Sequence, residues 1–373
     1  MAIGQGAVEG VGLTPAFWRG RRVFLTGHTG FKGSWLALWL EALGARVTGF
    51  ALAPPSQPSL FELARVAEGI TSLHGDIRDL PALQAALAAQ RPQIVIHMAA
   101  QSLVRVSYRD PVETYHTNVL GTVHVLEAVR QVGGVDAVVV VTSDKCYENR
   151  ERGAACRETD AMGGHDPYSS SKGCAELVTS AYRRAFFAAA AGAVTQVASV
   201  RAGNVIGGGD WAADRLVPDV VRALEAGSPL AVRNPDAVRP WQYVLEPLAG
   251  YLMLAEALCR DGAACAEAWN FGPDADDVRT VRDVLGRLAQ VWQRPLQWSP
   301  VAGPQPHEAR LLMLDSSKAR ERLGWRPRLP LAQALQRTAA WYQAHWDGED
   351  LRAVTLRELQ RYTAALAGAA PDA

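Results

Sequence analysis

Two groups of polar residues have the types and the spacing of a catalytic site. Ser143, Asp144 and Lys145 follow an apolar run of four valines. Tyr168 and Lys172 are four residues apart, so on a helix their side chains lie on one face. A phenol with an ordinary pKa of ~10 is a weak base at neutral pH, but a neighbouring ammonium favours the phenolate and lowers that pKa. Tyr168 is therefore a candidate general base.

Each group also has an ordinary structural explanation. Polar residues commonly end strands, so Ser143–Lys145 taken alone need have no function. Tyrosine and lysine four residues apart also occur on many helices without a catalytic role. The elements that position these residues have to decide between the two explanations.

The surrounding segments alternate between strand and helix patterns. Short apolar runs predict strands at 21–27, 46–52, 72–76, 93–100 and 138–141. Helical spacing, ended by Gly44 in the first case, predicts helices at 31–45, 80–90 and 117–132. This alternation implies right-handed βαβ crossovers and an α/β fold with a Rossmann-type doubly wound parallel sheet. Ligands of such sheets bind at the carboxyl ends of the strands, where Ser143–Lys145 fall.

Beyond about residue 200 the patterns become mixed. Helical and short extended segments at 216–227, 238–258 and 280–292 indicate a smaller mixed α/β domain that covers the cleft. We expect a Rossmann domain over residues 1–200 that carries the candidate catalytic residues, and a substrate-binding domain mainly over 201–373, with interleaving segments. The Ala-rich tail after about residue 364 is expected to be frayed.

Composition narrows the class of protein. The 373 residues are 49% hydrophobic, enough for one large or two interlocked domains. Lys plus Arg equals Asp plus Glu at 38 each, so no long-range field favours nucleic acid or an anionic membrane, and local groups must meet any anionic ligand. Five cysteines without a CxxC pair and histidines without metal-site spacing predict neither disulfides nor a metal. With no signal peptide or membrane span visible, we expect a soluble cytoplasmic protein.

The stretch TGHTGFKG at 26–33 lies between the first strand and the first helix. Its glycines, Gly27, Gly30 and Gly33, would let the backbone approach a diphosphate at the helix N-terminus, although glycines also serve tight packing. After the third strand, Asp76 could bind an adenine amino group, and Asp79 is more simply a helix N-cap.

The acid that usually holds the cofactor ribose is missing. The segment GFALAPPS at 49–56 contains no acidic residue, and no arginine replaces it. The motif therefore leaves NAD and NADP open, and it predicts a loosely held cofactor.

Together these motifs resemble the extended short-chain dehydrogenase/reductase family, and the resemblance covers nearly the whole chain. In that family a TGxxGxxG loop, a strand-end Ser or Thr and a YxxxK helix oxidise or reduce a sugar hydroxyl with a nicotinamide. The resemblance implies these roles for Ser143, Tyr168 and Lys172. It implies NAD as cofactor, held by Gly27, Thr29, Gly30, Phe31, Lys32, Gly33, Asp76, Ile77, Ala99, Ala100, Tyr168 and Lys172.

Further segments are similar to a narrower group, the nucleotide-sugar 4,6-dehydratases that act on CDP-glucose. They include VTSDKCYEN at 141–149, VRAGNVIGGGDWAADRLVPD at 200–219 and WNFGP at 269–273. The implied reaction, formally that of a hydro-lyase, oxidises C4, eliminates water across C5 and C6, and returns the hydride to C6. The resemblance also implies a homodimer or homotetramer, and a substrate held by Gln101, Asn204, Arg215, Arg239, Trp241 and His307.

One residue departs from the pattern of related dehydratases. In the enzymes that act on dTDP-glucose, an Asp acid is followed by a Glu base. Here Asp144 keeps the acid position, but Lys145 occupies the base position. An ammonium cannot accept a proton, so Lys145 must either be neutral when it acts or stabilise the developing enolate while another group moves the proton.

Several alternatives stay open. Another nucleotide-sugar 4,6-dehydratase, acting on dTDP-glucose or GDP-mannose, or a 4-epimerase could use the same scaffold. Asp144 and Lys145 argue against an epimerase, which needs no acid and base at C5 and C6. The retained Ser143 and Tyr168 argue against a non-catalytic dinucleotide sensor. Trp241 is as well explained by a core position, and His165 is considered only because it precedes the YxxxK helix.

Overall fold

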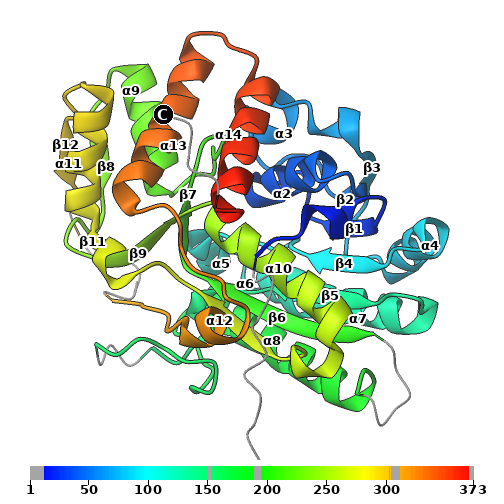
Figure 1. Ribbon diagram of the computed structural model, residues 1–373. Helices are drawn as coiled ribbons and strands as arrows, with labels where there is room; N and C mark the ends of the chain where they lie inside the picture. Colours follow the sequence, from blue (N-terminus) through cyan, green and yellow to red (C-terminus); the bar gives the residue numbers. More distant parts are fainter. Residues whose placement is uncertain (1–11, 150–152, 189–194, 302, 304–310, 369–373) are drawn as a thin grey trace, which may run out of the picture.

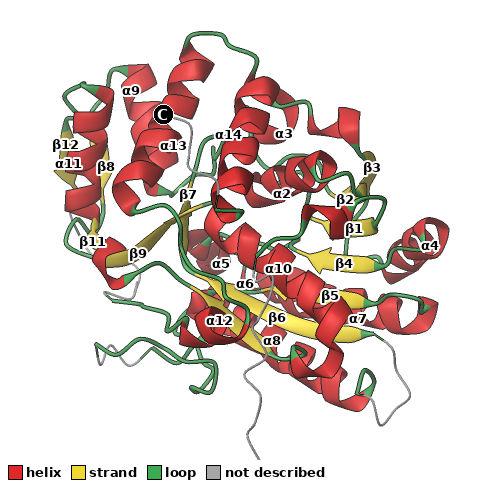
Figure 2. Cartoon of the chain, in the orientation of Figure 1, coloured by secondary structure: helices red, strands yellow, loops and turns green. Residues whose placement is uncertain are grey.

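A seven-stranded parallel sheet forms the centre of the protein (Figures 1 and 2). The structure, a computed structural model, describes residues 12–149, 153–188, 195–301, 303 and 311–368. The strand order is β10-β6-β5-β4-β1-β2-β3. The strands are β1 Arg22–Thr26, β2 Arg46–Ala51, β3 Thr71–His74, β4 Ile94–His97, β5 Ala137–Val141, β6 Gln196–Ala202 and β10 Ala268–Phe271. The predicted doubly wound parallel sheet is confirmed.

The strand residues alternate between two hydrophobic cores, one on each face of the sheet. On β1, Val23 and Leu25 join the core of one face, and Phe24 joins the other. The first face is covered by α2 Phe31–Ala42 and α10 Leu245–Asp261. The second face is covered by α4 Leu80–Gln90, α7 Gly121–Val132 and α8 Pro167–Ala185. Because both faces are covered, these strands are nearly continuous apolar runs.

Most predicted elements form close to their expected bounds, with one local difference. Gly44, at φ +81°, closes the turn after α2, and α4 spans the predicted 80–90. The predicted helix over 117–132 instead begins with the π-helical turn η2 His116–Leu120, which leads into α7. In this turn Asn118 exchanges hydrogen bonds with the backbone of Gln101, so the irregular turn holds the segment that follows β4.

A second lobe lies beside the carboxyl ends of the strands, at the upper left of Figure 1. It contains a three-stranded sheet and a two-stranded sheet. The strands are β7 Asn204–Ile206, β9 Val238–Tyr243 and β11 Val278–Thr280, then β8 Leu230–Val232 and β12 Trp298–Pro300. The helices are α9 Leu216–Ala226, α11 Val281–Trp292 and α13 Leu331–Trp346. Between β9 and β11 the chain returns to the large sheet as α10 and β10.

The C-terminal helix extends further than expected. Helix α14, Leu351–Leu366, packs on α2, where the ring of Tyr362 meets Trp39 and its hydroxyl donates to the buried Glu246. These contacts hold α14 as far as Leu366, two residues past the approximate start of the tail that was predicted to fray; residues 369–373 of that tail lie outside the described part. The shorter helices are α1 Pro15–Trp18, α3 Leu60–Leu63, α5 Val104–Arg109, α6 Pro111–Tyr115 and α12 Ser317–Arg322. Among the described residues, no helix has the length and apolar character needed to cross a membrane.

Candidate active site

A cavity of about 810 Å³ lies between the carboxyl ends of the strands and the second lobe. Its lining contains eight basic and five acidic side chains, although the whole chain is balanced. The expected local groups for an anionic ligand are therefore gathered in one place. The sheet order puts the ends of β1, β2 and β3 on one side of the cavity and the second lobe on the other, with β4 and β5 between them.

The glycine loop after β1 fits a dinucleotide diphosphate. A Cβ on Gly33 would lie 2.1 Å from the carbonyl oxygen of Gly27, and one on Gly27, at φ +77°, would lie 2.7 Å from the amide nitrogen of Ala99. Helix α2 begins at Phe31 with Gly30 as N-cap and no side-chain cap. The first-turn amides are thus available to an anion. Thr29, Phe31, Lys32 and Ala100 also line the cavity.

The adenosine end of this loop has fewer polar partners than predicted. Leu52 and Ala53 line the cavity after β2 where a ribose-binding acid would stand. The carboxylate of Asp76 accepts hydrogen bonds from the guanidinium of Arg78, and these bonds lower the pKa of Asp76. Asp76 and its neighbour Ile77 line the cavity as predicted, but Asp76 is already occupied. Asp79 caps α4 through the amide of Ala82, as expected.

The strand-end residues converge at the middle of the cavity. The hydroxyl of Ser143 donates to Oδ1 of Asp144 at 2.9 Å and accepts from the amide of Lys145. Asp144 is 2% exposed, and its Oδ2 has no hydrogen-bond partner among the described residues. A Cβ on Gly203 would lie 3.0 Å from this Oδ2, so the missing side chain lets the backbone after β6 pack closely against the carboxyl group. Burial raises the pKa of Asp144, which favours the protonated acid.

Tyr168 and Lys172 lie on one face of α8 and both line the cavity, as their spacing predicts. The predicted lowering of the Tyr168 pKa by a neighbouring ammonium is wrong. Burial raises the pKa of Tyr168 to about 12, even though a hydrogen bond with Ser143 lowers it. Burial also lowers the pKa of Lys172 to about 8, and its Nζ lies 3.5 Å from the carbonyl oxygen of Val141. Desolvation is the largest cause of both shifts.

A buried ion pair beneath the site was not predicted. Glu176, one turn after Lys172 on α8, accepts from Arg201 on β6 at 2.8 Å. The same carboxylate accepts from Thr142 at 2.5 Å and from Ser199 at 2.7 Å. It therefore ties α8 to the ends of β5 and β6. The 168, 172, 176 spacing marks one helical face and is the signal that identifies this residue.

We expect Glu176→Ala to lower the free energy of unfolding by about 3–5 kcal/mol, because it leaves the buried Arg201 guanidinium uncompensated. Arg260→Ala, which removes a pair with side-chain exposures of 63% and 40%, is the control and should cost less than about 1 kcal/mol. Urea unfolding followed by circular dichroism measures both. Equal losses in the two variants would contradict a structural role for the Glu176 pair.

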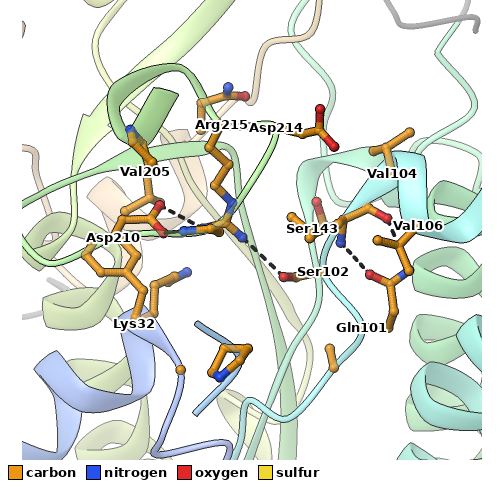
Figure 3. Close-up of a pocket in the computed structure, with 18 of the residues that line it drawn as sticks. Lys32, Gln101, Ser102, Val104, Val106, Ser143, Val205, Asp210, Asp214 and Arg215 are labelled. Carbon is orange, nitrogen blue, oxygen red and sulfur yellow. Dashed lines mark hydrogen bonds and ion pairs between the residues drawn. The ribbon is translucent and has the colours of Figure 1, made fainter. Parts of the chain in front are cut away.

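The second lobe contributes the predicted substrate residues. Arg215 donates to Asp210 at 3.0 Å and to Ser102 at 3.2 Å (Figure 3). Arg239 lies close enough to Asp144 to lower the pKa of that carboxyl, and it also lines the cavity. Asn204, the first residue of β7, also lines the cavity.

The remaining predicted residues differ in outcome. The side-chain amide of Gln101 binds Leu103 and Thr114, so it stabilises its own loop at the cavity wall. Trp241 lines the cavity, but it is 4% exposed, belongs to the hydrophobic core and donates its indole N–H to the carbonyl oxygen of Arg279, which fits a core position at the cavity wall. His165 is exposed and is absent from the cavity lining, and His307 lies outside the described residues. No cluster of His, Cys, Asp and Glu in the described ranges could hold a metal ion.

The ammonium of Lys32 is a further feature that the loop motif did not reveal. Its Nζ is 2.9 Å from the hydroxyl of Tyr251 and 4.9 Å from the centre of that ring. Burial, together with Arg215 and Lys172, lowers the pKa of Lys32 to about 7. Lys32 is therefore a second lysine in the cavity whose charge can change near neutral pH.

Comparison with known proteins gives consistent results. The family described as GDP-mannose 4,6 dehydratase matches residues 24–338. The chain is 53% identical over 351 residues to a CDP-glucose 4,6-dehydratase of Salmonella typhimurium, covering 94% of this chain and 98% of that protein. A dTDP-glucose 4,6-dehydratase of Streptomyces venezuelae, solved with NAD bound, is 25% identical with a TM-score of 0.75, covering 89% of this chain and 99% of that one. A UDP-glucose 4-epimerase of Thermus thermophilus, in complex with NAD, is 27% identical with a TM-score of 0.73, covering 86% and 99%.

Proposed function

The chain belongs to the GDP-mannose 4,6 dehydratase family, and from this premise we propose that it is an NAD-dependent hydro-lyase that converts CDP-D-glucose to CDP-4-dehydro-6-deoxy-D-glucose and water. One observation carries the reaction type. A buried carboxyl group with an unpartnered oxygen, that of Asp144, adjoins the Ser143 and Tyr168 hydroxyls in a single cavity. The hydroxyl groups of Ser143 and Tyr168 are sufficient for oxidation of a sugar hydroxyl. The additional acid, Asp144, can protonate a departing hydroxyl, which elimination of water requires.

Oxidation at C4 uses Ser143, Tyr168 and Lys172. The C4 hydroxyl hydrogen-bonds to the two hydroxyl side chains, and Tyr168 accepts its proton as the carbonyl forms. Lys172, when it is protonated, stabilises the phenolate form of Tyr168 that accepts this proton. Burial raises the pKa of Tyr168 to about 12, so positive charge beside the hydroxyl is needed to favour the phenolate.

NAD, when bound, accepts the hydride from C4 and returns it to C6. The glycine loop and the first turn of α2 would hold its diphosphate, and Asp76, Ile77, Ala99 and Ala100 would line its adenosine and nicotinamide ribose.

Elimination uses Asp144 and Lys145. Protonated Asp144 donates to the departing C6 hydroxyl, which leaves as water while the C5 proton is removed. Burial favours the protonated form of this carboxyl, and its Oδ2, which has no partner among the described residues, is left to hydrogen-bond the departing hydroxyl. The amine of Lys145, partly exposed at the cavity wall, is the proposed acceptor of the C5 proton, and a proton returns to C5 when the hydride reaches C6.

The direct test is to incubate the purified protein and NAD with CDP-, dTDP- and UDP-glucose and GDP-mannose in separate reactions, and to identify the products by mass. CDP-glucose should lose one water. Conversion to an isomer of unchanged mass would indicate the 4-epimerase that the T. thermophilus comparison makes the second candidate. Loss of water from another nucleotide sugar alone would overturn the CDP-glucose assignment.

We expect activity to require added NAD, or to rise strongly with it. The cavity wall after β2 presents Leu52 and Ala53 where an acid would hold the ribose, so the cofactor should dissociate readily. The measurement is the rate against NAD concentration after extensive dialysis, together with the cofactor content of the purified protein. NADPH should neither accumulate nor be needed. Stoichiometric NAD that survives dialysis, with no response to added cofactor, would contradict this expectation.

Three broader assignments belong to the same proposal. Residues 1–200 mainly bind the cofactor and carry the catalytic groups, and residues 201–373 mainly bind the nucleotide sugar. The enzyme acts in the cytoplasm as a homodimer or homotetramer. Exposed apolar side chains on α6, η2 and α8 favour self-association: Val112, Leu120, Leu177 and Phe186. Light scattering on the purified protein measures the mass, and a monomer at micromolar concentration would exclude the oligomer.

A further inference from the structure

A carboxylate held by two arginines lies on the second-lobe side of the cavity. Asp214 accepts from Arg233, next to the end of β8, at 2.5 Å, and from Arg105 on α5 at 3.3 Å. All three residues line the cavity. Figure 3 shows Asp214 projecting on the side where Val104, the neighbour of Arg105, also lies.

The backbone at Asp214 is held in an unusual conformation. Its φ is +62°, in the left-handed region that residues other than glycine seldom adopt. The second Nη of Arg233 donates to the carbonyl oxygen of Asp214 at 3.2 Å, so one guanidinium fixes both the backbone and the carboxylate. Strained residues that are fixed in this way are found at ligand clamps.

The pair keeps hydrogen-bonding capacity that faces the cavity. Oδ1 of Asp214 accepts from both arginines, whereas its Oδ2 accepts no hydrogen bond from the described residues. Two of the five N–H groups of Arg233 are used on Asp214, which leaves three without a partner in the described part of the chain. The side chains are 24% exposed for Arg233 and 29% for Asp214. A ligand in the cavity can therefore hydrogen-bond to one acceptor, Oδ2 of Asp214, and to several neighbouring donors, the N–H groups of Arg233.

This pattern does not suit a phosphate. The carboxylate of Asp214, 29% exposed, would repel an anion, and it offsets one of the two guanidinium charges beside it. Arg215 differs, because its partner Asp210 is only 5% exposed while its own guanidinium is 34% exposed. The diphosphate is therefore better met at Arg215, and the Asp214–Arg233 pair is left for a neutral part of the nucleotide.

We propose that Asp214 and Arg233 recognise the base of the nucleotide and select cytosine over uracil and thymine. The cytosine edge presents the N4 amino group as donor, followed by N3 and O2 as acceptors. Asp214 Oδ2 accepts from N4, and the unpaired N–H groups of Arg233 donate to N3 and O2. Uracil and thymine present O4 as an acceptor and N3–H as a donor, so they face the carboxylate and the guanidinium with the wrong groups. Sites built to hydrogen-bond one pattern reject analogues strongly.

The inference rests on the proposed function only in placing a nucleotide in this cavity. The catalytic residues lie at the end of β5, and the cofactor loop follows β1. The part of the cavity next to the second lobe is therefore the part that remains for the base. Val104 and Val232, sequence neighbours of the two arginines, line the same cavity and offer aliphatic surface for the flat faces of the ring.

The test measures affinities of CDP, UDP and dTDP by isothermal titration calorimetry, with the protein saturated with NADH. CDP and UDP carry the same diphosphate and ribose, so their ratio of Kd values isolates the base. Wild type should favour CDP by ~10- to 100-fold. Asp214→Asn, which tolerates the same backbone conformation, should bring the ratio close to one, mainly by weakening CDP. Arg105→Gln is the matched control and should keep most of the preference, because it removes a neighbour of Asp214 but neither base-reading group.

Three outcomes would overturn the inference: equal binding of CDP and UDP by wild type, equal weakening of both by Asp214→Asn, or loss of the preference in Arg105→Gln to the same extent. Thermal unfolding and NADH binding show whether each variant is folded, and Arg233→Gln supplies a second variant if Asp214→Asn is not. The mass assay separates this inference from the proposed function. Dehydration of CDP-glucose without CDP preference defeats only the inference, whereas CDP preference without dehydration defeats only the function.

Discussion

Tyr168→Phe is expected to reduce dehydration of the nucleotide sugar by several orders of magnitude while leaving folding and cofactor binding nearly intact. The substitution removes only the hydroxyl that accepts the C4 proton, and general bases supply ~10²–10⁴-fold in rate. Oxidation is the first step, so the later steps are lost with it. The cavity keeps its shape, because Tyr168 is buried on the regular helix α8 and phenylalanine fills the same space.

The measurements for this variant are product formation by mass and NADH absorbance after addition of substrate. Tyr182→Phe is the matched control: Tyr182 lies on the same helix, but its hydroxyl is 3.4 Å from Glu127 and it is absent from the cavity lining. The control should keep wild-type activity. Turnover of Tyr168→Phe within a few-fold of wild type would remove Tyr168 from the base role.

Lys145→Ala is expected to keep oxidation and lose elimination. Ser143, Tyr168 and Lys172 are untouched, so a hydride still leaves C4 and NADH absorbance accumulates with substrate. The reaction then stalls before water is lost. If Lys145 serves the removal of the C5 proton, exchange of the C5 hydrogen with deuterated water should be slower than in wild type.

Asp144→Asn provides the contrast. It replaces the acid that protonates the departing hydroxyl, so it should stall after the C5 proton has been exchanged and should keep that exchange. Deuterium at C5, measured by mass spectrometry of recovered substrate, distinguishes the two variants. Normal elimination by Lys145→Ala would make this lysine a solvated charge at a strand end and would direct attention to Lys32, whose pKa is about 7. Loss of hydride transfer as well would place Lys145 in oxidation or binding.

Local sequence was sufficient to predict the fold and the order of the catalytic groups. The predicted helix over 80–90 was observed with these bounds, because Asp79 caps it and its apolar spacing is helical. Glycine is required at positions 27 and 33, because a side chain at either position would collide with nearby backbone atoms. The spacing of Tyr168 and Lys172 puts both on one helical face in any context. Such features depend on residues a few positions apart, which a single chain displays directly.

Tertiary structure decided the charges and the partners. Burial reversed the expected direction of the Tyr168 pKa, and the fold placed Arg239 close enough to Asp144 to lower the pKa of that carboxyl. It also brought Asp214 and Arg105, 109 residues apart, into contact. Desolvation depends on how many atoms surround a group, and Coulomb interactions depend on distance in space. Neither quantity can be obtained from spacing along the chain, so the sequence alone determined which groups are available for the chemistry, and only the fold determined their protonation and what they meet.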